Sequence, residues 1–316
     1  MVKQKISIVI PAYNESAGIA HFYHGLTAAL PSKYSYELVF VNDGSSDDTL
    51  DILESLKKSD DSIRVISFSR NFGKEAATTA GITRSRGSAV IIIDADGQHP
   101  VGLINDFLKE WESGNKVVIG VRSANHNEGF IKRYGSKLFY AMFNAMAHET
   151  LVPGSTDFRL IDASVRVEFA KLKERGRITR ALIDWLGYKK SYVEFTANAQ
   201  EHGEASYTNS KLFKLAFNSF VSLTTFPLYA SGYLGLIIIP LSLIVGVFVI
   251  IEQFAMGDPM QLKITGSAML GIFIVFLVGI ILICQGLIAM YISRIYEEAK
   301  DRPLYIVEHD THSSEK

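Results

Sequence analysis

Two long stretches without charged residues constrain this chain more than any other feature. Residues 215–251 and 264–293 contain no Asp, Glu, Lys or Arg, which gives uncharged runs of 37 and 30 residues. A transmembrane helix needs roughly 20 consecutive apolar residues, so each run is long enough to cross a bilayer. We expect one membrane span within 229–251 and a second within 267–292. The alternative is a pair of helices in a soluble all-α domain.

The basic residues beside these runs predict the orientation of the chain. Cytoplasmic flanks of membrane spans are enriched in Lys and Arg. Five basic residues lie on the two long flanks: Lys211, Lys214, Arg294, Lys300 and Arg302. The short loop 252–266 contains Lys263 together with two acidic residues. We therefore expect a multi-pass protein of the cell inner (plasma) membrane, with its large N-terminal region and both termini in the cytoplasm.

The uncharged runs divide the chain into four parts. Residues 1–208 are enough for one large globular domain or two small ones. Residues 209–228 have apolar positions at helical spacing, which indicates an amphipathic helix in the membrane interface or the first turns of a long, tilted span. Residues 229–293 contain the two spans, and residues 294–316 form a cytoplasmic tail.

The composition excludes several classes of protein. The chain has 32 Lys and Arg against 33 Asp and Glu, a net charge of −1, so we expect no nucleic-acid partner. Its single cysteine excludes a disulfide framework and any zinc cluster built from cysteines.

The N-terminal region alternates apolar runs with stretches of helical periodicity. The apolar runs begin at Ile6, Tyr36, Ile63, Ser88 and Lys116. The run within 88–93 is continuously apolar, as expected for a strand that is buried on both faces. Repeated strand–helix units predict an α/β fold, with a mostly parallel sheet and helices on both faces.

Polar side chains follow the expected strands where each one ends. They are Glu15, Asn42, Asp43, Asp94, Asp96 and Arg122. Any one of them alone could be a solvated loop residue. Ligands of parallel α/β sheets bind beyond the carboxyl ends of the strands, so several acids at this edge indicate a site.

Asp94 and Asp96 follow the most apolar strand and are two residues apart. In an extended segment such residues point to the same side, and two like charges repel unless a cation lies between them. Oxygen ligands without cysteine favour Mg²⁺ or Mn²⁺, usually bridging substrate phosphates. Gln98 adds a further oxygen, and His99 is a weaker candidate. The chain has neither a P-loop nor a dinucleotide fingerprint.

Five motifs together resemble family 2 glycosyltransferases of the GT-A fold. They are PAYNE (11–15), VNDGSSDDT (41–49), SRNFGKEAA (69–77), DADGQHP (94–100) and STDFRL (155–160). More narrowly, the chain resembles the polyprenyl-phosphate glycosyltransferases, which include dolichyl-phosphate mannosyltransferases and bacterial undecaprenyl-phosphate sugar transferases. HGEASY (202–207), the amphipathic stretch and the two spans fit the bacterial branch related to O-antigen glucosylation.

The resemblance implies a role for each matching residue. The nucleotide-sugar site would comprise Pro11, Tyr13, Glu15, Asp43, Asp94, Ala95, Asp96 and Arg122. The metal, Mg²⁺ or Mn²⁺, would be held by Asp94, Asp96 and Gln98. The catalytic residues would be Asp157, Asp96 and Arg122. Relatives often have basic residues at the positions of Gln200 and Ala205, and a larger side chain at Gly97, so this chain departs from the family there.

The acceptor phosphate calls for basic residues. Its candidates are Lys132, Arg133, Lys137, Arg159, Lys211 and Lys214. Each is otherwise a solvated surface charge, although Arg159 lies only two residues from Asp157. Arg70 and Lys74 have two equal interpretations, as phosphate contacts or as part of the start of a helix.

The resemblance predicts transfer of a hexose from a nucleotide diphosphate sugar to a polyprenyl phosphate. Glucose is the first expectation for the hexose, and UDP for the nucleotide. A phosphate monoester is largely dianionic at neutral pH and needs little help from a base. We therefore expect a single displacement with inversion, with Asp157 orienting groups rather than accepting a proton; the alternative is a true general base. Two other functions stay open, a processive polysaccharide synthase and a non-catalytic nucleotide-sugar binder. Small residues in the spans would also allow a homo-oligomer.

Overall fold

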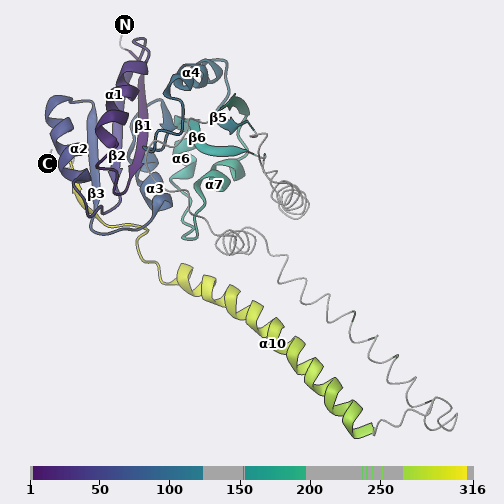
Figure 1. Ribbon diagram of the computed structural model, residues 1–316. Coiled ribbons are helices and arrows are strands. Elements are labelled where there is room, and N and C mark those ends of the chain that lie inside the picture. The colour runs from purple at the N-terminus through teal and green to yellow at the C-terminus, as the bar shows by residue number, and fades with distance from the viewer. Residues whose placement is uncertain are drawn as a thin grey trace. The chain divides into compact units, whose positions relative to one another are not determined.

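The computed structural model describes residues 3–123, 152, 154–196 and 266–311, with four single positions between 237 and 251. The chain forms two compact units (Figure 1). One contains residues 1–206 together with 302–316, and the other contains residues 207–301.

The first unit is built on an eight-stranded sheet among the described residues, in the order β7-β5-β6-β4-β1-β2-β3-β8. The strands are β1 (Lys5–Ala12), β2 (Ser35–Asn42), β3 (Ile63–Phe68), β4 (Ala89–Ile92), β5 (Val117–Arg122), β6 (Ser155–Asp162), β7 (Lys190–Phe195) and β8 (Val307–Asp310). The pairs β1–β2, β1–β4, β2–β3 and β5–β7 are parallel, whereas β6 and β8 pair antiparallel to their neighbours. The predicted α/β fold with a mostly parallel sheet is confirmed.

Helices cover both faces of this sheet (Figure 1). They are α1 (Ile19–Ala29), α2 (Thr49–Ser59), α3 (Lys74–Arg84), α4 (Ile104–Glu112) after the 3-10 turn η1 (Val101–Leu103), α6 (Ala163–Phe169) and α7 (Thr179–Trp185). Successive residues of a strand point to opposite faces. Ile8 therefore packs with side chains of α1, α2 and α4, and Val9 packs with side chains of α3, α6 and α7.

Small residues let α3 lie close against the sheet. A Cβ atom added at Gly81 would come within 2.2 Å of Val9 Cγ1. Ala77 and Ala80 are fully buried on the same helix. Because α3 packs so tightly on the central strands, its first residue, Lys74, is held near the carboxyl end of β4.

The C-terminal segment of the chain adds the edge strand β8. Asp310 accepts two hydrogen bonds from Arg64, at 3.0 Å from Nε and 2.8 Å from Nη2, and a third at 3.0 Å from Arg84 Nη1. The ring of Tyr305 stacks on Phe68 with 4.9 Å between centroids. The sequence of the tail 294–316 does not predict β8, because a strand of four residues is too short to show a periodicity.

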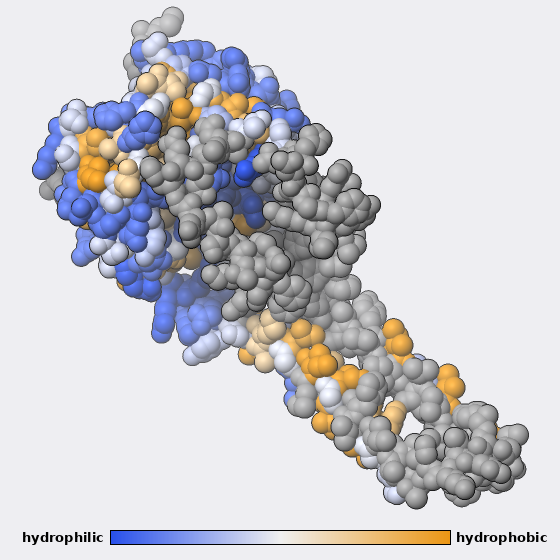
Figure 2. Space-filling model, in the orientation of Figure 1, coloured by the Kyte–Doolittle hydropathy of each residue, from blue (hydrophilic) through white to orange (hydrophobic). Residues whose placement is uncertain are grey.

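The second unit contains α10 (Gly266–Ala299), which includes the predicted second span. Among the described residues, one segment is long and apolar enough to cross a membrane, Leu277–Ala299, with a mean hydropathy of 1.9. Figure 2 shows apolar side chains along this helix, whereas the visible face of the first unit is mostly hydrophilic. The first span and the amphipathic helix lie almost wholly outside the described residues, so two transmembrane helices stay a prediction.

Candidate active site

The described residues form several cavities at the carboxyl edge of the central strands, and two of them have volumes above 200 Å³. The first has a volume of about 270 Å³, and it is formed by the ends of β1, β2 and β4 and by the start of α3. Its lining residues are Pro11, Ala12, Tyr13, Glu15, Asp43, Asn71, Gly73, Lys74, Ala77, Asp94, Ala95 and Asp96. The structure therefore brings together every residue predicted for the nucleotide-sugar site except Arg122.

The second cavity, of about 210 Å³, lies beside the first. It is lined by Asp94, Asp96, Gln98, His99, Arg122, Ser155, Thr156, Asp157, Arg180 and Phe195. Of the residues that the structure describes, Asp94 and Asp96 are the two that line both cavities. The acidic pair is therefore the boundary between an acid-lined cavity with an exposed tyrosine and a cavity with two arginines.

Hydrogen bonds between neighbouring loops shape the first cavity. The backbone N–H of Asn14 donates to Ser45 Oγ at 3.0 Å, and that of Ser16 donates to Asp47 Oδ2 at 3.1 Å. Burial acts to raise the pKa of Asp47, but hydrogen bonds from Thr49 and Ser16 outweigh it and lower the pKa to about 2. The loops after β1 and β2 are thus tied together, which leaves Tyr13 47% exposed on the cavity wall.

Asp43 positions the loop that leads into α3. Its two carboxylate oxygens accept hydrogen bonds from the backbone N–H groups of Phe72 at 2.7 Å and Gly73 at 2.9 Å. Burial raises the pKa of Asp43, although these two bonds act in the opposite direction. Gly73 has a φ of +98°, a conformation that favours glycine and lets α3 begin directly at the cavity.

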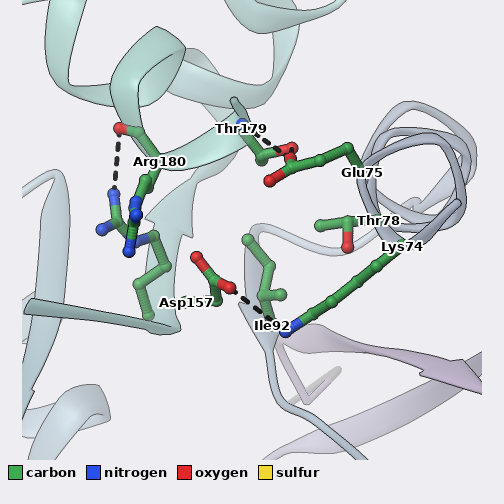
Figure 3. A pocket seen from close by; sticks show the side chains of 8 residues that line it. Lys74, Glu75, Thr78, Ile92, Asp157, Thr179 and Arg180 are labelled. Carbon is green, nitrogen blue, oxygen red and sulfur yellow. Dashed lines mark hydrogen bonds and ion pairs between the residues drawn. The ribbon is translucent and has the colours of Figure 1, made fainter. Parts of the chain in front are cut away.

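Lys74 connects the acidic pair to Asp157. Its Nζ lies 2.7 Å from Asp94 Oδ1, 2.8 Å from Asp94 Oδ2 and 3.1 Å from Asp157 Oδ2. Figure 3 shows Lys74, from α3, and Asp157, from β6, pointing toward each other. Burial lowers the pKa of Lys74, but attraction to Asp94 and Asp157 outweighs it, so the pKa is raised and the side chain is a cation at neutral pH. No motif in the sequence indicates this bridging position of Lys74.

Asp157 is held as a carboxylate. Burial acts to raise its pKa, but the charges of Lys74 and Arg180 outweigh burial and hold the pKa below its usual range. Glu75 Oε2 accepts a 2.7 Å hydrogen bond from the backbone N–H of Thr179, which ties the start of α3 to the start of α7. This bond places Lys74 and Arg180 around Asp157 (Figure 3).

Arg159 lies in the interior, and its direct contact with the acceptor phosphate stays a prediction. It is 1% exposed, and its guanidinium donates to the carbonyl oxygens of Thr156 at 3.0 Å and Arg180 at 3.2 Å. Because β6 runs antiparallel to β4, residues after Asp157 lead away from the carboxyl edge. Arg180 is exposed and lines the second cavity instead, a position that local sequence around Asp157 could not reveal.

Arg122, predicted for the nucleotide-sugar site and for catalysis, ends β5 as an exposed residue of the second cavity. The remaining basic residues predicted for the acceptor phosphate have no described position. Lys132, Arg133, Lys137, Lys211 and Lys214 lie outside the described residues. Their proposed contacts therefore stay predictions.

The carboxylates fit an open site for a divalent cation. Among the described residues, no three His, Cys, Asp or Glu side chains form a closed metal cage. Mg²⁺ is usually bound by one or two carboxylates together with waters and substrate phosphates, and Asp94 and Asp96 supply such a pair. Asp96 Oδ1 accepts a 3.0 Å bond from the N–H of Gln98, and the buried Nδ1 of His99, 3.9 Å from Asp94 Oδ2, has no hydrogen-bond partner. Burial lowers the pKa of His99 and so favours the neutral imidazole. A neutral imidazole nitrogen can serve as a ligand of a cation.

Comparison with models of protein families assigns the chain to one family. Residues 7–168 match the model of glycosyl transferase family 2, a range that includes Asp94, Asp96 and Asp157. The chain belongs to glycosyltransferase family 2. It is therefore a glycosyltransferase, as the motifs indicated.

Individual relatives extend the similarity over nearly the whole chain. An uncharacterised glycosyltransferase of Synechocystis is 38% identical over 304 residues, 96% of this chain and 94% of that one. The bactoprenol glucosyl transferase of Shigella phage SfV is 35% identical over 307 residues, 97% of this chain and 99% of that one. Glucosyl-3-phosphoglycerate synthase from Mycobacterium tuberculosis, crystallised with Mn²⁺, UDP-glucose and phosphoglyceric acid, is 17% identical, with a TM-score of 0.46 over 70% of this chain and 78% of that one.

Proposed function

We propose that this glycosyltransferase moves a hexose, with glucose as the first expectation, from a nucleotide diphosphate sugar to a polyprenyl phosphate. The observation that supports this most is that Asp94 and Asp96 lie between a cavity with the exposed Tyr13 and a cavity that also contains Arg122 and Arg180. The similarity to bactoprenol glucosyl transferases over the full chain supports the same substrates. The product is a lipid-linked monosaccharide for glycosylation of the cell envelope.

The donor nucleotide occupies the first cavity in this proposal. The exposed ring of Tyr13 offers a stacking surface for the base, and Glu15 and Asp43 lie beside it to accept hydrogen bonds from base and ribose. Asp94 and Asp96 would hold Mg²⁺ or Mn²⁺, with Gln98 close by. When bound, such a cation neutralises the diphosphate and acts as a Lewis acid for the leaving group.

The acceptor phosphate occupies the second cavity. Two unit charges 4 Å apart repel by about 4 kcal/mol at an effective dielectric constant of 20, so a phosphate needs cations to approach the donor. Arg122 and Arg180 line this cavity, and guanidinium groups bind phosphate oxygens through charge-assisted hydrogen bonds. They would hold the acceptor in line with the sugar carbon for a single displacement with inversion.

Asp157 orients groups at this centre and accepts no proton in the proposed reaction. Its lowered pKa makes it a weak base, and its carboxylate is bonded to Lys74. An orienting carboxylate predicts that D157N remains impaired at every pH. A variant that recovered fully at high pH, where the acceptor is a complete dianion, would instead indicate a general base.

We place the enzyme in the inner membrane as a multi-pass protein. The apolar segment Leu277–Ala299 and the uncharged run 215–251 support two spans, with the catalytic unit and both termini in the cytoplasm. This location would give the first unit access to a lipid phosphate at the bilayer surface.

Product analysis tests the proposal. Full-length protein in nanodiscs is mixed with Mn²⁺, undecaprenyl phosphate and radiolabelled UDP-glucose, with other labelled nucleotide sugars in parallel, and D96N is the control. We expect label in the organic phase as one hexose per lipid, and NMR of the product should show inverted anomeric configuration. A polymer would support a processive synthase, and absence of transfer from every donor would support a binding protein.

A further inference from the structure

The position of Lys74 is set by carboxylates across the cavity and not by its own helix. Lys74 is the first residue of α3, where the helix dipole disfavours a cation. Its side chain is 48% exposed, and its Nζ nevertheless lies within 2.8 Å of both oxygens of Asp94. A single ammonium therefore lies against both carboxylate oxygens of Asp94, the atoms that a divalent cation would also use.

We propose that Lys74 is a positioning residue that competes with the divalent cation for Asp94. When the nucleotide diphosphate binds, Lys74 releases Asp94. This inference rests on the proposed function, because it concerns the donor and cation of that same site. In this inference the ammonium of Lys74 is the positive charge that holds Asp94 and Asp157 together until a nucleotide diphosphate binds.

The first cavity provides the route for this exchange. Lys74, Asp94 and Asp96 all line it, so a diphosphate bound there lies within reach of the ammonium. Lysine has a flexible four-carbon stem and a point charge, so Nζ can transfer from a carboxylate to a phosphate oxygen by rotations of its side chain. Asp94 is then free to bind the metal that accompanies the diphosphate.

The exchange makes metal and nucleotide bind cooperatively. Without a diphosphate, the cation must displace an ammonium whose remaining described anionic partner is Asp157. With a diphosphate, the ammonium gains a new partner as it leaves Asp94. Coupling of this kind is reciprocal, so the metal must strengthen nucleotide binding by the same factor. Lys74 also contacts Asp157, so the exchange alters the wall of the second cavity as well.

Mn²⁺ binding to the full-length protein tests this inference without any turnover. Free Mn²⁺ is measured by electron paramagnetic resonance during titration of wild type, K74M and K74Q, each with and without UDP. K109M is the matched control, because it removes the same charge from an exposed pair with Asp106 on α4. Thermal unfolding without metal checks that each variant is folded, and K74Q serves if K74M is not.

We expect K74M and K74Q to bind Mn²⁺ alone about tenfold more tightly than wild type, a change typical of coupling between sites. UDP should strengthen Mn²⁺ binding strongly in wild type and much less in these variants, and K109M should match wild type. Equal or weaker Mn²⁺ binding by both Lys74 variants would overturn the inference, as would the same gain in K109M. If D94N abolishes Mn²⁺ binding while the Lys74 variants match wild type, only the role of Lys74 fails. If wild type with UDP binds no Mn²⁺, the metal site of the proposed function fails too.

Discussion

Two clusters of carboxylates and cations in the first unit differ in burial and in purpose. The edge cluster consists of Asp310 with Arg64 and Arg84, where the side chains of Arg64 and Asp310 are 6% and 4% exposed. The site cluster consists of Lys74 with Asp94 and Asp157, where the carboxylates are 19% and 34% exposed.

Their hydrogen bonding explains the difference. Three bonds from two guanidinium groups satisfy Asp310, and Arg84 also approaches from the surface, so the edge cluster fixes one arrangement of β8 on β3. A buried carboxylate is tolerated only when it is paired in this way. The site cluster has one flexible ammonium between two acids at a cavity wall, so its partners can be exchanged for a ligand. We infer that burial distinguishes charges that hold the fold from charges that perform chemistry.

Substitution at the acidic pair should give the largest effect. D96N removes a proposed metal ligand whose described hydrogen bond is to the backbone of Gln98, so the fold should not suffer. We expect transfer activity to fall roughly 10³-fold, as when a group that stabilises developing charge is removed. The melting temperature should stay within about 2 °C of wild type, since surface substitutions rarely change stability. D106N, which changes an acid on α4, is the control. Wild-type activity in D96N would contradict the assignment of Asp96 to the chemistry of the site.

Removal of the edge carboxylate should give the opposite result. D310A leaves the buried guanidinium of Arg64 unpaired, which costs about 3–5 kcal/mol for a buried pair. The melting temperature should fall by roughly 10 °C. Activity per folded molecule at low temperature should remain that of wild type. A stable D310A protein, or a folded one that has lost activity, would contradict the division of roles.

A carboxylate that stabilises the fold should also make the free energy of unfolding depend on pH. Burial acts to raise the pKa of Asp162, but bonds from Ser164, Trp111 and Lys116 outweigh it and lower the pKa to about 2. A lowered pKa in the folded state gives stability that is present above the unfolded value, about 3.9, and is lost as pH falls toward 2.

We therefore expect D162N to be about 2 kcal/mol less stable than wild type at pH 7, with the difference shrinking below pH 4. Thermal unfolding followed by tryptophan fluorescence measures it, because Trp111 Nε1 donates to Asp162 Oδ2 at 2.7 Å. A difference that is independent of pH would mean that the charge of Asp162 contributes nothing.

The smallest effect should come from Arg180. R180Q should raise KM for the polyprenyl phosphate about tenfold and leave the donor KM unchanged, as expected when one charged contact to a bound phosphate is lost. Steady-state kinetics with each substrate varied in turn measures both constants. An increase confined to the donor KM would place the donor phosphates, and not the acceptor, beside Arg180.

The sequence predicted the site where the signal was local. Asp94 and Asp96 follow an apolar strand, so the end of that strand predicted both at one edge, although they lie in the turn beyond β4 and not in an extended segment. The burial of Arg159 was not predicted, because its distance in sequence from Asp157 did not reveal the direction of β6. Arg180 and β8 depend on contacts between segments that are distant in sequence, such as Glu75 with Thr179 and Arg64 with Asp310. No pattern within either segment contains that information.

Anomalous scattering at the manganese edge, from crystals of the full-length protein grown with Mn²⁺ and UDP, tests most directly whether Asp94 and Asp96 hold the cation of the donor. We expect one manganese peak bound by Asp94 or Asp96 and by the diphosphate, the uracil beside Tyr13, and Lys74 Nζ on a phosphate oxygen. A manganese peak away from both carboxylates, or UDP seated in the cavity of Arg122 and Arg180, would contradict it.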